Sequence, residues 1–283
     1  MLVKLSMKFS IVIPSFNQGK FIERTIESVL GQKYKNVEII VVDGGSTDGT
    51  MEILKKYGDK IKWISEKDNG QTEAINKGIR MATGDIMAYL NSDDTYEKDT
   101  LNIVAKYFEE SPKTMIVYGK GRHIDENDKY INDYPTEKVD VNVLKIKCPI
   151  CQPTVFWRRE LWTDIGEFDE KLNFAMDYQY WLRVAEKYNF DFIDEYLANT
   201  RLYGETKTLS QKEEVAKEII KVHKNLFGKV DDKWILNYIG EKYGNDKKVW
   251  IRESFKMIWK VNKRPPASKT WKIYLIWIKE LIN

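Results

Sequence analysis

The 283-residue sequence lacks the features that mark several specialised classes of protein. It has two cysteines, Cys148 and Cys151, and two histidines, His123 and His223, so no second ligand pair completes a four-ligand zinc site. We expect both cysteines to be reduced and structural. No run reaches the roughly 18 apolar residues that span a bilayer, and the N-terminus lacks the apolar segment and cleavage site of a signal peptide. These absences predict a cytoplasmic protein, either free or peripheral at the inner face of the membrane.

The charge balance is nearly even, with 46 basic and 43 acidic residues and a net charge of +3. Such a balance gives no reason to expect a nucleic acid partner. The basic excess gathers late in the chain, and we find neither an internal repeat nor a low-complexity tract.

Short apolar runs alternate with amphipathic helical patterns over the first 110 residues. The pattern predicts strands at 9–14, 37–43, 61–65 and 86–90, and helices at 22–30, 51–57, 72–82 and 101–108. Thr47 or Asp48 is the expected N-cap of the second helix, and Gly84 the C-cap of the third. This alternation predicts an α/β fold with a parallel sheet covered on both faces.

The pattern is less regular in the second part of the chain. It predicts strands at 115–118 and 154–157, a hairpin or loop insertion at 119–140, helices at 159–165 and 177–188, and two short strands near Phe190 and Ala198. After Tyr203, Lys-rich and Trp-rich helical segments run to the C-terminus, with a break at Pro265–Pro266.

Polar residues follow the apolar strands where each strand ends. Asp43 ends the second strand, and Asn91, Asp93 and Asp94 follow the run 86–90. In open α/β sheets ligands bind at the carboxyl ends of the strands, and hard oxygen ligands there suit Mg²⁺ or Mn²⁺ with a phosphate. A polar turn that merely ends a strand is the alternative interpretation.

Two further acidic positions carry alternative interpretations. The loop after Asp43 does not match the dinucleotide fingerprint, because Ser46 stands where the second glycine belongs, and it lacks the P-loop lysine. Asp43 then accepts hydrogen bonds from a ribose or base, or the loop only caps a helix. Asp177 lies in the first turn of a helix, where a carboxylate acts either as a cap or as a general base.

The motifs together resemble the family 2 glycosyltransferases, which have the GT-A fold and use nucleotide sugars. In chain order they are Ile-Val-Ile-Pro-Ser-Phe-Asn, Val-Val-Asp-Gly-Gly-Ser-Thr-Asp-Gly, Asn-Gly-Gln-Thr-Glu-Ala-Ile-Asn-Lys-Gly, Leu-Asn-Ser-Asp-Asp, Gly-Glu-Phe-Asp-Glu-Lys-Leu and Met-Asp-Tyr-Gln-Tyr-Trp-Leu-Arg. The resemblance covers residues 9–203. It implies a Rossmann-like, mostly parallel central sheet flanked by helices, with a C-terminal helical extension.

The resemblance also implies a nucleotide site. Pro14, Ser15 and Asn17 match the loop against the nucleotide, and Asp43 matches the first acid of the motif that holds base and ribose. Three positions in a segment that lines the same site have no assigned role: Asp68, Lys77 and Gly78.

The reactive groups follow from the same resemblance. Asn91, Ser92 and Asp93 match the Asp-X-Asp motif, whose last acid binds the Mn²⁺ or Mg²⁺ that bridges the donor diphosphate. Asp177 matches the acid that deprotonates the acceptor. The implied activity is inverting transfer from a nucleotide sugar, with UDP as the expected nucleotide, to a saccharide or lipid-linked saccharide.

The sequence departs from the family pattern at two positions. Gly44 stands where a second acid often contacts uracil, which leaves the identity of the base open. Asn91 replaces the first acid of Asp-X-Asp, which removes one negative charge, so we expect metal binding to depend on the oxygens of the donor diphosphate.

We predict a catalytic domain at 1–205, with a donor half at 1–118 and an acceptor half at 119–205, and a helical extension at 206–283. The segment Trp271–Ile282 is expected either to lie at a membrane interface or to pack on the domain or on a second subunit. Two other functions stay open at this point, a non-catalytic nucleotide or sugar binding module and a glycoside hydrolase, which uses two carboxylates without a nucleotide.

Overall fold

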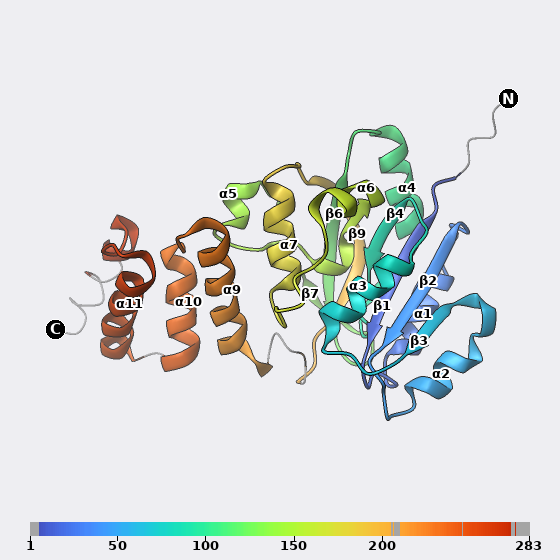
Figure 1. Ribbon diagram of the computed structural model, residues 1–283, viewed down its shortest axis with the longest axis horizontal. Coiled ribbons are helices and arrows are strands. Elements are labelled where there is room, and N and C mark those ends of the chain that lie inside the picture. The colour runs from blue at the N-terminus through green and yellow to red at the C-terminus, as the bar shows by residue number, and fades with distance from the viewer. Residues whose placement is uncertain (1–5, 205, 207–209, 245, 273–274, 276–283) are drawn as a thin grey trace. The chain divides into compact units, whose positions relative to one another are not determined.

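The computed structural model describes residues 6–204, 206, 210–244, 246–272 and 275. They form two compact units, one of the chain up to Leu144 with Pro149–Tyr203, and the other of Lys145–Cys148 with the helices after Gly204. Figure 1 shows the strands gathered in the first unit and the second unit made of helices.

The first unit is built on one sheet whose nine strands lie in the order β3-β2-β1-β4-β8-β6-β9-β5, with β7 paired to β6. The first four strands in this order pair in parallel, and antiparallel pairs enter from β8 onward. The strands are β1 Phe9–Ser15, β2 Val37–Asp43, β3 Lys62–Ser65, β4 Ile86–Tyr89, β5 Thr95–Tyr96, β6 Ile116–Ile124, β7 Tyr130–Asp133, β8 Phe156–Arg158 and β9 Asp191–Arg201.

Helices cover both faces of the sheet, and the alternation along β1 determines which residues each face receives. Ile11 and Ile13 point into one core with α1 and α4, whereas Val12 faces Gly78 of α3 on the other side. The helices of this unit are α1 Ile22–Leu30, α2 Thr50–Lys56, α3 Gln71–Met81, α4 Thr100–Glu110, α5 Val141–Leu144, α6 Arg159–Ile165 and α7 Met176–Ala185, with 3₁₀ turns at Gly58–Lys60 and Gln152–Thr154.

The predictions at Gly84, along β9 and at the start of β8 were wrong. Gly84 does not cap α3, which ends at Met81 with Ala82 as its C-cap. Gly84 instead passes so close to β1 that a Cβ would lie 2.6 Å from Ser10 Oγ. The strands expected near Phe190 and Ala198 are one eleven-residue strand, β9. The strand predicted from residue 154 begins at Phe156, after a 3₁₀ turn.

Asp48 supports the start of α2 from outside the helix. The N-cap is Gly49, not Thr47 or Asp48, and it makes no side-chain capping bond. Asp48 instead accepts a hydrogen bond from the Thr50 amide at 3.0 Å and one from the Gly19 amide at 2.8 Å. It therefore joins α2 to the loop after β1.

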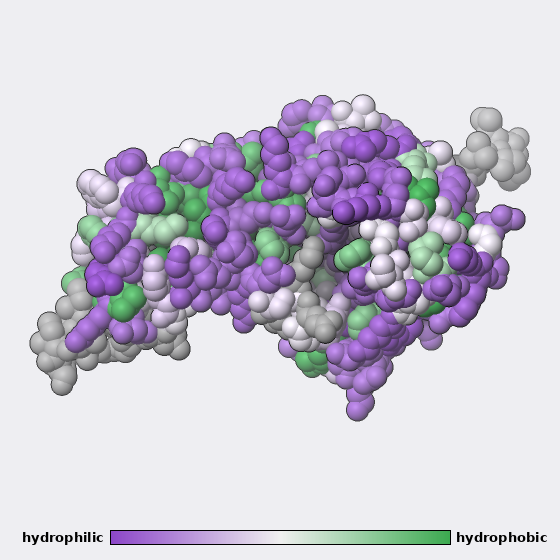
Figure 2. All heavy atoms as spheres, turned by 60° about the horizontal axis from the view of Figure 1, so that its bottom comes forward, coloured by the Kyte–Doolittle hydropathy of each residue, from purple (hydrophilic) through white to green (hydrophobic). Residues whose placement is uncertain are grey.

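The second unit is a small helical core of α9 Lys212–Phe227, α10 Asp232–Tyr243 and α11 Lys247–Asn262. Its buried side chains include Ile235, Ile239, Trp250 and Ile258. Over the described residues, no helix has the length and apolar character needed to cross a bilayer. Most of the segment Trp271–Ile282 lies outside the described residues. Hydrophilic residues cover most of the face seen in Figure 2, with hydrophobic ones in small groups.

Candidate active site

The site begins where β1, β2 and β4 end side by side. Ser15 is in register with Asp43, and Val12 with Tyr89, so the three parallel strands deliver their C-terminal residues to one edge. The sequence predicted this convergence from the polar residues that follow each apolar run. Ser15 is buried, and its hydroxyl has no hydrogen-bond partner among the described residues.

Asp43 is buried and shapes the loop that follows it. Its carboxylate accepts hydrogen bonds from the amides of Gly45 at 3.1 Å and Ser46 at 2.9 Å, and from the Ser46 and Ser65 hydroxyls at 2.5 and 2.7 Å. A hydroxyl of a bound ribose would have to share or replace one of these bonds. The loop is thus preorganised around the carboxylate by its own donors.

Asn17 joins the loop after Pro14 to the loop after Asp43. Its backbone is left-handed, with φ 54°, a conformation that asparagine tolerates better than most residues. Its backbone amide donates to Ser46 Oγ at 2.7 Å, and its side-chain Oδ1 accepts from the Thr47 backbone amide at 2.9 Å. Both loops expected at the nucleotide are therefore held in one arrangement.

Asp68 lies beside the position where the sequence departs from the family pattern. A Cβ on Gly44 would meet the Asp68 Oδ2 at 3.0 Å, so an acidic side chain at residue 44 would compete with Asp68 for the same space. Burial raises the pKa of the Asp68 carboxyl, whereas a hydrogen bond from the Gly70 amide lowers it.

The other two positions expected to line the nucleotide site differ in where they lie. Lys77 is paired with Glu66 at 2.5 Å and lies 3.8 Å from Glu73. Gly78 is buried under the sheet, where a Cβ would lie 2.3 Å from Val12 Cγ1. Tight packing of α3 on the sheet is therefore sufficient to explain the glycine.

The residues after β4 form a connected set. Asn91 accepts a hydrogen bond from Gln71 at 2.7 Å and donates to Asp94 at 3.1 Å and to Gln152 at 3.3 Å. Ser92 is buried, and its carbonyl accepts from the Thr25 hydroxyl. Asp94 is buried, and burial together with the neighbouring Asp93 raises its pKa. Asp93 is the more exposed carboxylate of the pair.

Arg201, the last residue of β9, and Tyr203, two residues later, hold the Asp93 loop, and no sequence motif indicated either of them. Tyr203 donates a hydrogen bond to Asp93 Oδ2 at 2.9 Å. Burial and the Asp93 charge raise the pKa of Tyr203, so this hydroxyl stays protonated and able to donate. Arg201, whose side chain is fully buried, donates to the Asp93 carbonyl at 2.7 Å and pairs with Asp128 at 2.6 Å.

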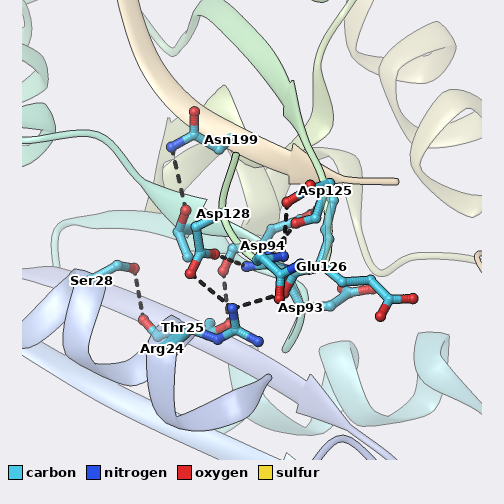
Figure 3. A network of polar contacts seen from close by, with 12 residues as sticks. Arg24, Thr25, Ser28, Asp93, Asp94, Asp125, Glu126, Asp128 and Asn199 are labelled. Carbon is cyan, nitrogen blue, oxygen red and sulfur yellow. Dashed lines mark hydrogen bonds and ion pairs between the residues drawn. The ribbon is translucent and has the colours of Figure 1, made fainter. Parts of the chain in front are cut away.

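Figure 3 shows Asp93 and Asp94 beside Asp125, Glu126 and Asp128 of the β6–β7 turn. The Arg201 guanidinium also donates to the Asp125 carbonyl at 2.6 Å, so one buried side chain joins this turn to the Asp93 loop. No short motif marks such a residue, because its partners lie 73 to 108 positions away in the sequence.

A cleft of about 730 Å³ lies beside this network rather than at Asp43 or Asp177. Its walls include Arg24, Arg122 and Tyr130. The guanidinium groups pair with Asp128 and Glu97, at 2.8 and 2.6 Å.

Asp177 lies in the first turn of α7, as predicted, and its Oδ1 accepts a hydrogen bond from the Tyr178 amide at 2.6 Å. The loop before α7 is tied to α3 by two hydrogen bonds. The Thr72 hydroxyl donates to the Leu172 carbonyl, and the Asn76 side-chain amide donates to the Phe168 carbonyl. This loop therefore packs against the helix that follows the Asp68 segment.

The residues around Asp93 fit a divalent metal only if substrate phosphates supply further ligands. Among the described residues, no three His, Cys, Asp or Glu side chains gather into a metal centre. Asp93 with the neighbouring Asn91 supplies one carboxylate and one amide. Mg²⁺ and similar hard cations are commonly bound by one or two carboxylates together with substrate phosphates, and this set fits that mode.

Comparison with known proteins identifies the family of this chain. The family model described as glycosyl transferase family 2 matches residues 10–166, more than half of the chain. An uncharacterised glycosyltransferase of Rickettsia felis is 34% identical over 206 residues, 71% of this chain and 34% of the relative. One of Rickettsia prowazekii is 31% identical over 224 residues, 72% of this chain and 68% of the relative. Chondroitin synthase of Escherichia coli is 29% identical over 218 residues, 74% of this chain and 31% of the relative.

The chain spans about a third of the length of the first of these relatives. Among solved structures, S. aureus TarS 1-349 in complex with UDP-GlcNAc has a TM-score of 0.63 at 20% identity, over 90% of this chain and 82% of that one. Mannosyltransferase PcManGT from Pyrobaculum calidifontis, in complex with GDP-Man and Mn²⁺, has a TM-score of 0.55 at 16% identity, over 90% and 70%. These likenesses confirm the predicted fold.

Proposed function

This chain belongs to glycosyl transferase family 2 and is a glycosyltransferase. From that premise we propose that it transfers a sugar from a nucleoside diphosphate donor with inversion of the configuration at the anomeric carbon. The proposed donor is a UDP-sugar, and the proposed acceptor is a saccharide or a lipid-linked saccharide. The observation that carries the proposal is the convergence of Ser15, Asp43 and Asn91 at the carboxyl ends of adjacent parallel strands.

The nucleotide is proposed to lie over the loops that follow Pro14 and Asp43. The unpartnered Ser15 hydroxyl and the amides around Asn17 offer hydrogen bonds, and Asp43 accepts one from the ribose. Asp68 lies against Gly44. Its carboxylate is proposed to contact the nucleobase in place of the acid that the family often has at residue 44. Lys77 needs to leave Glu66 before it can reach a phosphate.

Asp93 is the proposed metal ligand, and Mn²⁺ or Mg²⁺ bound there with the diphosphate would neutralise charge on the leaving group. Tyr203 orients the Asp93 carboxylate through its hydrogen bond. Asn91 is kept in place by Gln71 and Asp94, and Ser92 by its carbonyl bond to Thr25.

Asp177 is the proposed general base. As the acceptor oxygen attacks the anomeric carbon, its proton passes to the Asp177 carboxylate, while the bond from that carbon to the diphosphate oxygen breaks and the nucleoside diphosphate leaves with the electron pair. Attack from the face opposite the leaving group inverts the anomeric configuration. Holding both substrates in line supplies the remaining acceleration.

The test is a thermal-shift screen with UDP-, GDP- and dTDP-sugars in Mn²⁺, followed by transfer assays with the donor that stabilises the chain most. We expect a UDP-sugar to be selective, and EDTA or Asp93→Ala to abolish transfer. Asp59→Asn changes an exposed acid on the 3₁₀ turn and is the matched control, which should retain full activity.

Three outcomes would contradict parts of the proposal. Full activity of Asp93→Ala, or in EDTA, would remove the metal assignment. Nucleotide binding without transfer to any acceptor would point to a binding module. Release of sugar from an oligosaccharide without a nucleotide donor would point to a glycoside hydrolase.

A further inference from the structure

Helix α11 presents a stripe of aromatic and cationic side chains to solvent. Phe255 and Trp259 lie one turn apart on its outer side and are 37% and 53% exposed. Trp250, Ser254 and Ile258 are buried on the opposite side, against the core of the helical unit. The outer stripe, called here the α11 face, has helical spacing and consists of Lys248, Arg252, Phe255, Lys256, Trp259 and Lys260.

The aromatic part of the α11 face is larger than a single exposed ring. The Trp271 ring, 40% exposed, lies edge-on to Phe255 with centroids 5.9 Å apart. A shallow hollow of about 420 Å³ is lined by Phe255, Trp259 and the two lysines that follow them. Exposed groups of large apolar side chains with a polar rim usually mark a surface for a partner or a membrane.

The charge of this region is strongly one-sided. Residues 246–272 contain nine Lys and Arg but only Asp246 and Glu253 as acids, while the whole chain has a net charge of only +3. Asp246 accepts the N-terminal amides of α11. Glu253 pairs with Arg252 at 2.7 Å and with Lys256 at 3.2 Å. No carboxylate of the described residues pairs with Lys260.

We propose that the α11 face binds the anionic surface of a lipid bilayer. Trp and Phe favour the boundary between headgroups and acyl chains, and lysine stems lie along apolar surface while their ammonium groups reach lipid phosphates. A helix with an aromatic strip bordered by cations matches both layers of that boundary. The described part of α11 is thus suited to lie on a membrane, not to cross it.

The positive charge of the α11 face favours an anionic bilayer over a second copy of the chain as its partner. A twofold contact through the α11 face would bring the same cationic stripe of both copies together, with few carboxylates to offset the repulsion. An anionic bilayer instead gains from each cation. The inference does not depend on the proposed sugar transfer, because vesicle binding needs neither nucleotide nor acceptor.

The test is co-sedimentation of the full chain with phosphatidylcholine vesicles, with and without phosphatidylglycerol, in the absence of nucleotide. We expect binding to the anionic vesicles that weakens at high salt. Phe255→Ser/Trp259→Ser should weaken it at least tenfold. Lys256→Gln/Lys260→Gln should weaken it roughly 20-fold, because each cation near an anionic surface contributes about a fivefold gain.

Matched controls change similar side chains elsewhere. Tyr130→Ser/Ile131→Ser removes two side chains that are 60% and 46% exposed on β7, and Lys106→Gln/Lys113→Gln removes two exposed lysines near the end of α4. Both should bind vesicles like the unchanged chain.

The proposal is overturned if the unchanged chain does not bind anionic vesicles, or if all variants bind equally. A concentration-dependent dimer in light scattering that Trp259→Ser dissolves, without vesicle binding, would assign the face to a second copy. The α11 variants should keep their thermal stability and their rate on a soluble acceptor. A chain that binds vesicles but transfers no sugar would contradict only the proposed function.

Discussion

Replacing Gly78 with alanine tests whether this glycine is required by packing or by a ligand. A Cβ there would lie 2.3 Å from Val12 Cγ1 and 3.2 Å from Val42 Cγ2. Carbon atoms in contact are about 3.5–4.0 Å apart, so a Val12 methyl must move by roughly 1.2 Å or more. Val12 lies in β1, which pairs with β2 and β4, so the strand has little freedom to retreat.

The magnitude follows from two opposing effects. Overpacking a core costs about 1–3 kcal/mol, and this contact belongs at the upper end of that range. Replacing glycine by alanine inside a helix returns about 1 kcal/mol. We therefore expect Gly78→Ala to lower the free energy of unfolding by about 1–2 kcal/mol, and the melting temperature of a unit of this size by about 3–6 °C.

The measurement is urea and thermal unfolding, with Gly240→Ala in α10 as the matched control. A Cβ on Gly240 would have its nearest neighbour at 3.8 Å, so that variant should be neutral or more stable. In a Val12→Ala background, Gly78→Ala should become stabilising, because the obstructing methyls are gone. Wild-type stability of Gly78→Ala combined with lost UDP binding would refute the packing explanation.

Three further predictions concern the residues beyond the sequence motifs. Tyr203→Phe should weaken Mn²⁺ binding in the presence of UDP by about tenfold or more, measured by electron paramagnetic resonance, because the Asp93 carboxylate loses its orienting donor; unchanged affinity would argue against this role. Arg201→Met should lower stability by about 2–4 kcal/mol in urea unfolding, since the Asp93 and Asp125 carbonyls and the Asp128 carboxylate lose a donor; a loss below 1 kcal/mol would show that Arg201 does not hold the two loops together. Burial lowers the pKa of His223 to about 4, below the ordinary value of 6.5, so the unfolded chain binds a proton first as pH falls from about 6.5 to about 4, and stability should decline by up to about 3 kcal/mol across that range. His223→Leu should reduce the difference between the free energies of unfolding measured at pH 7 and pH 5. An unchanged difference would mean that other groups cause the decline.

The strands β1–β4 and helices α1–α4 of residues 9–110 could be predicted because their signals are local. Apolar runs that stop at Asp43 and Asn91 define both strands and their ends, and parallel pairing then brings those ends together. The long strand β9 was divided in two because exposed residues such as Glu195 interrupt its apolar pattern, while its pairing with β6 maintains the strand. Pairing with a distant strand has no signature within the segment itself.

In the candidate site too, local signals could be predicted from the sequence and long-range contacts could not. Residues that belong to short motifs could be named in advance, whereas Arg201 and Tyr203 act on Asp93 across more than a hundred residues. The motif also gave Gly78 a place near the nucleotide, although its contacts with Val12 already explain why no side chain fits there. A motif position therefore indicates a neighbourhood, and only the contacts indicate what the residue does there.

The central claim is tested most directly by sugar transfer from a UDP-sugar by Asp177→Asn. Asparagine can still accept the Tyr178 amide hydrogen bond, so the fold and the thermal shift caused by UDP should not change. Because general base catalysis contributes about 10²–10⁴-fold, we expect the transfer rate to fall by that factor. Transfer at the unchanged rate, with UDP still bound, would contradict the account.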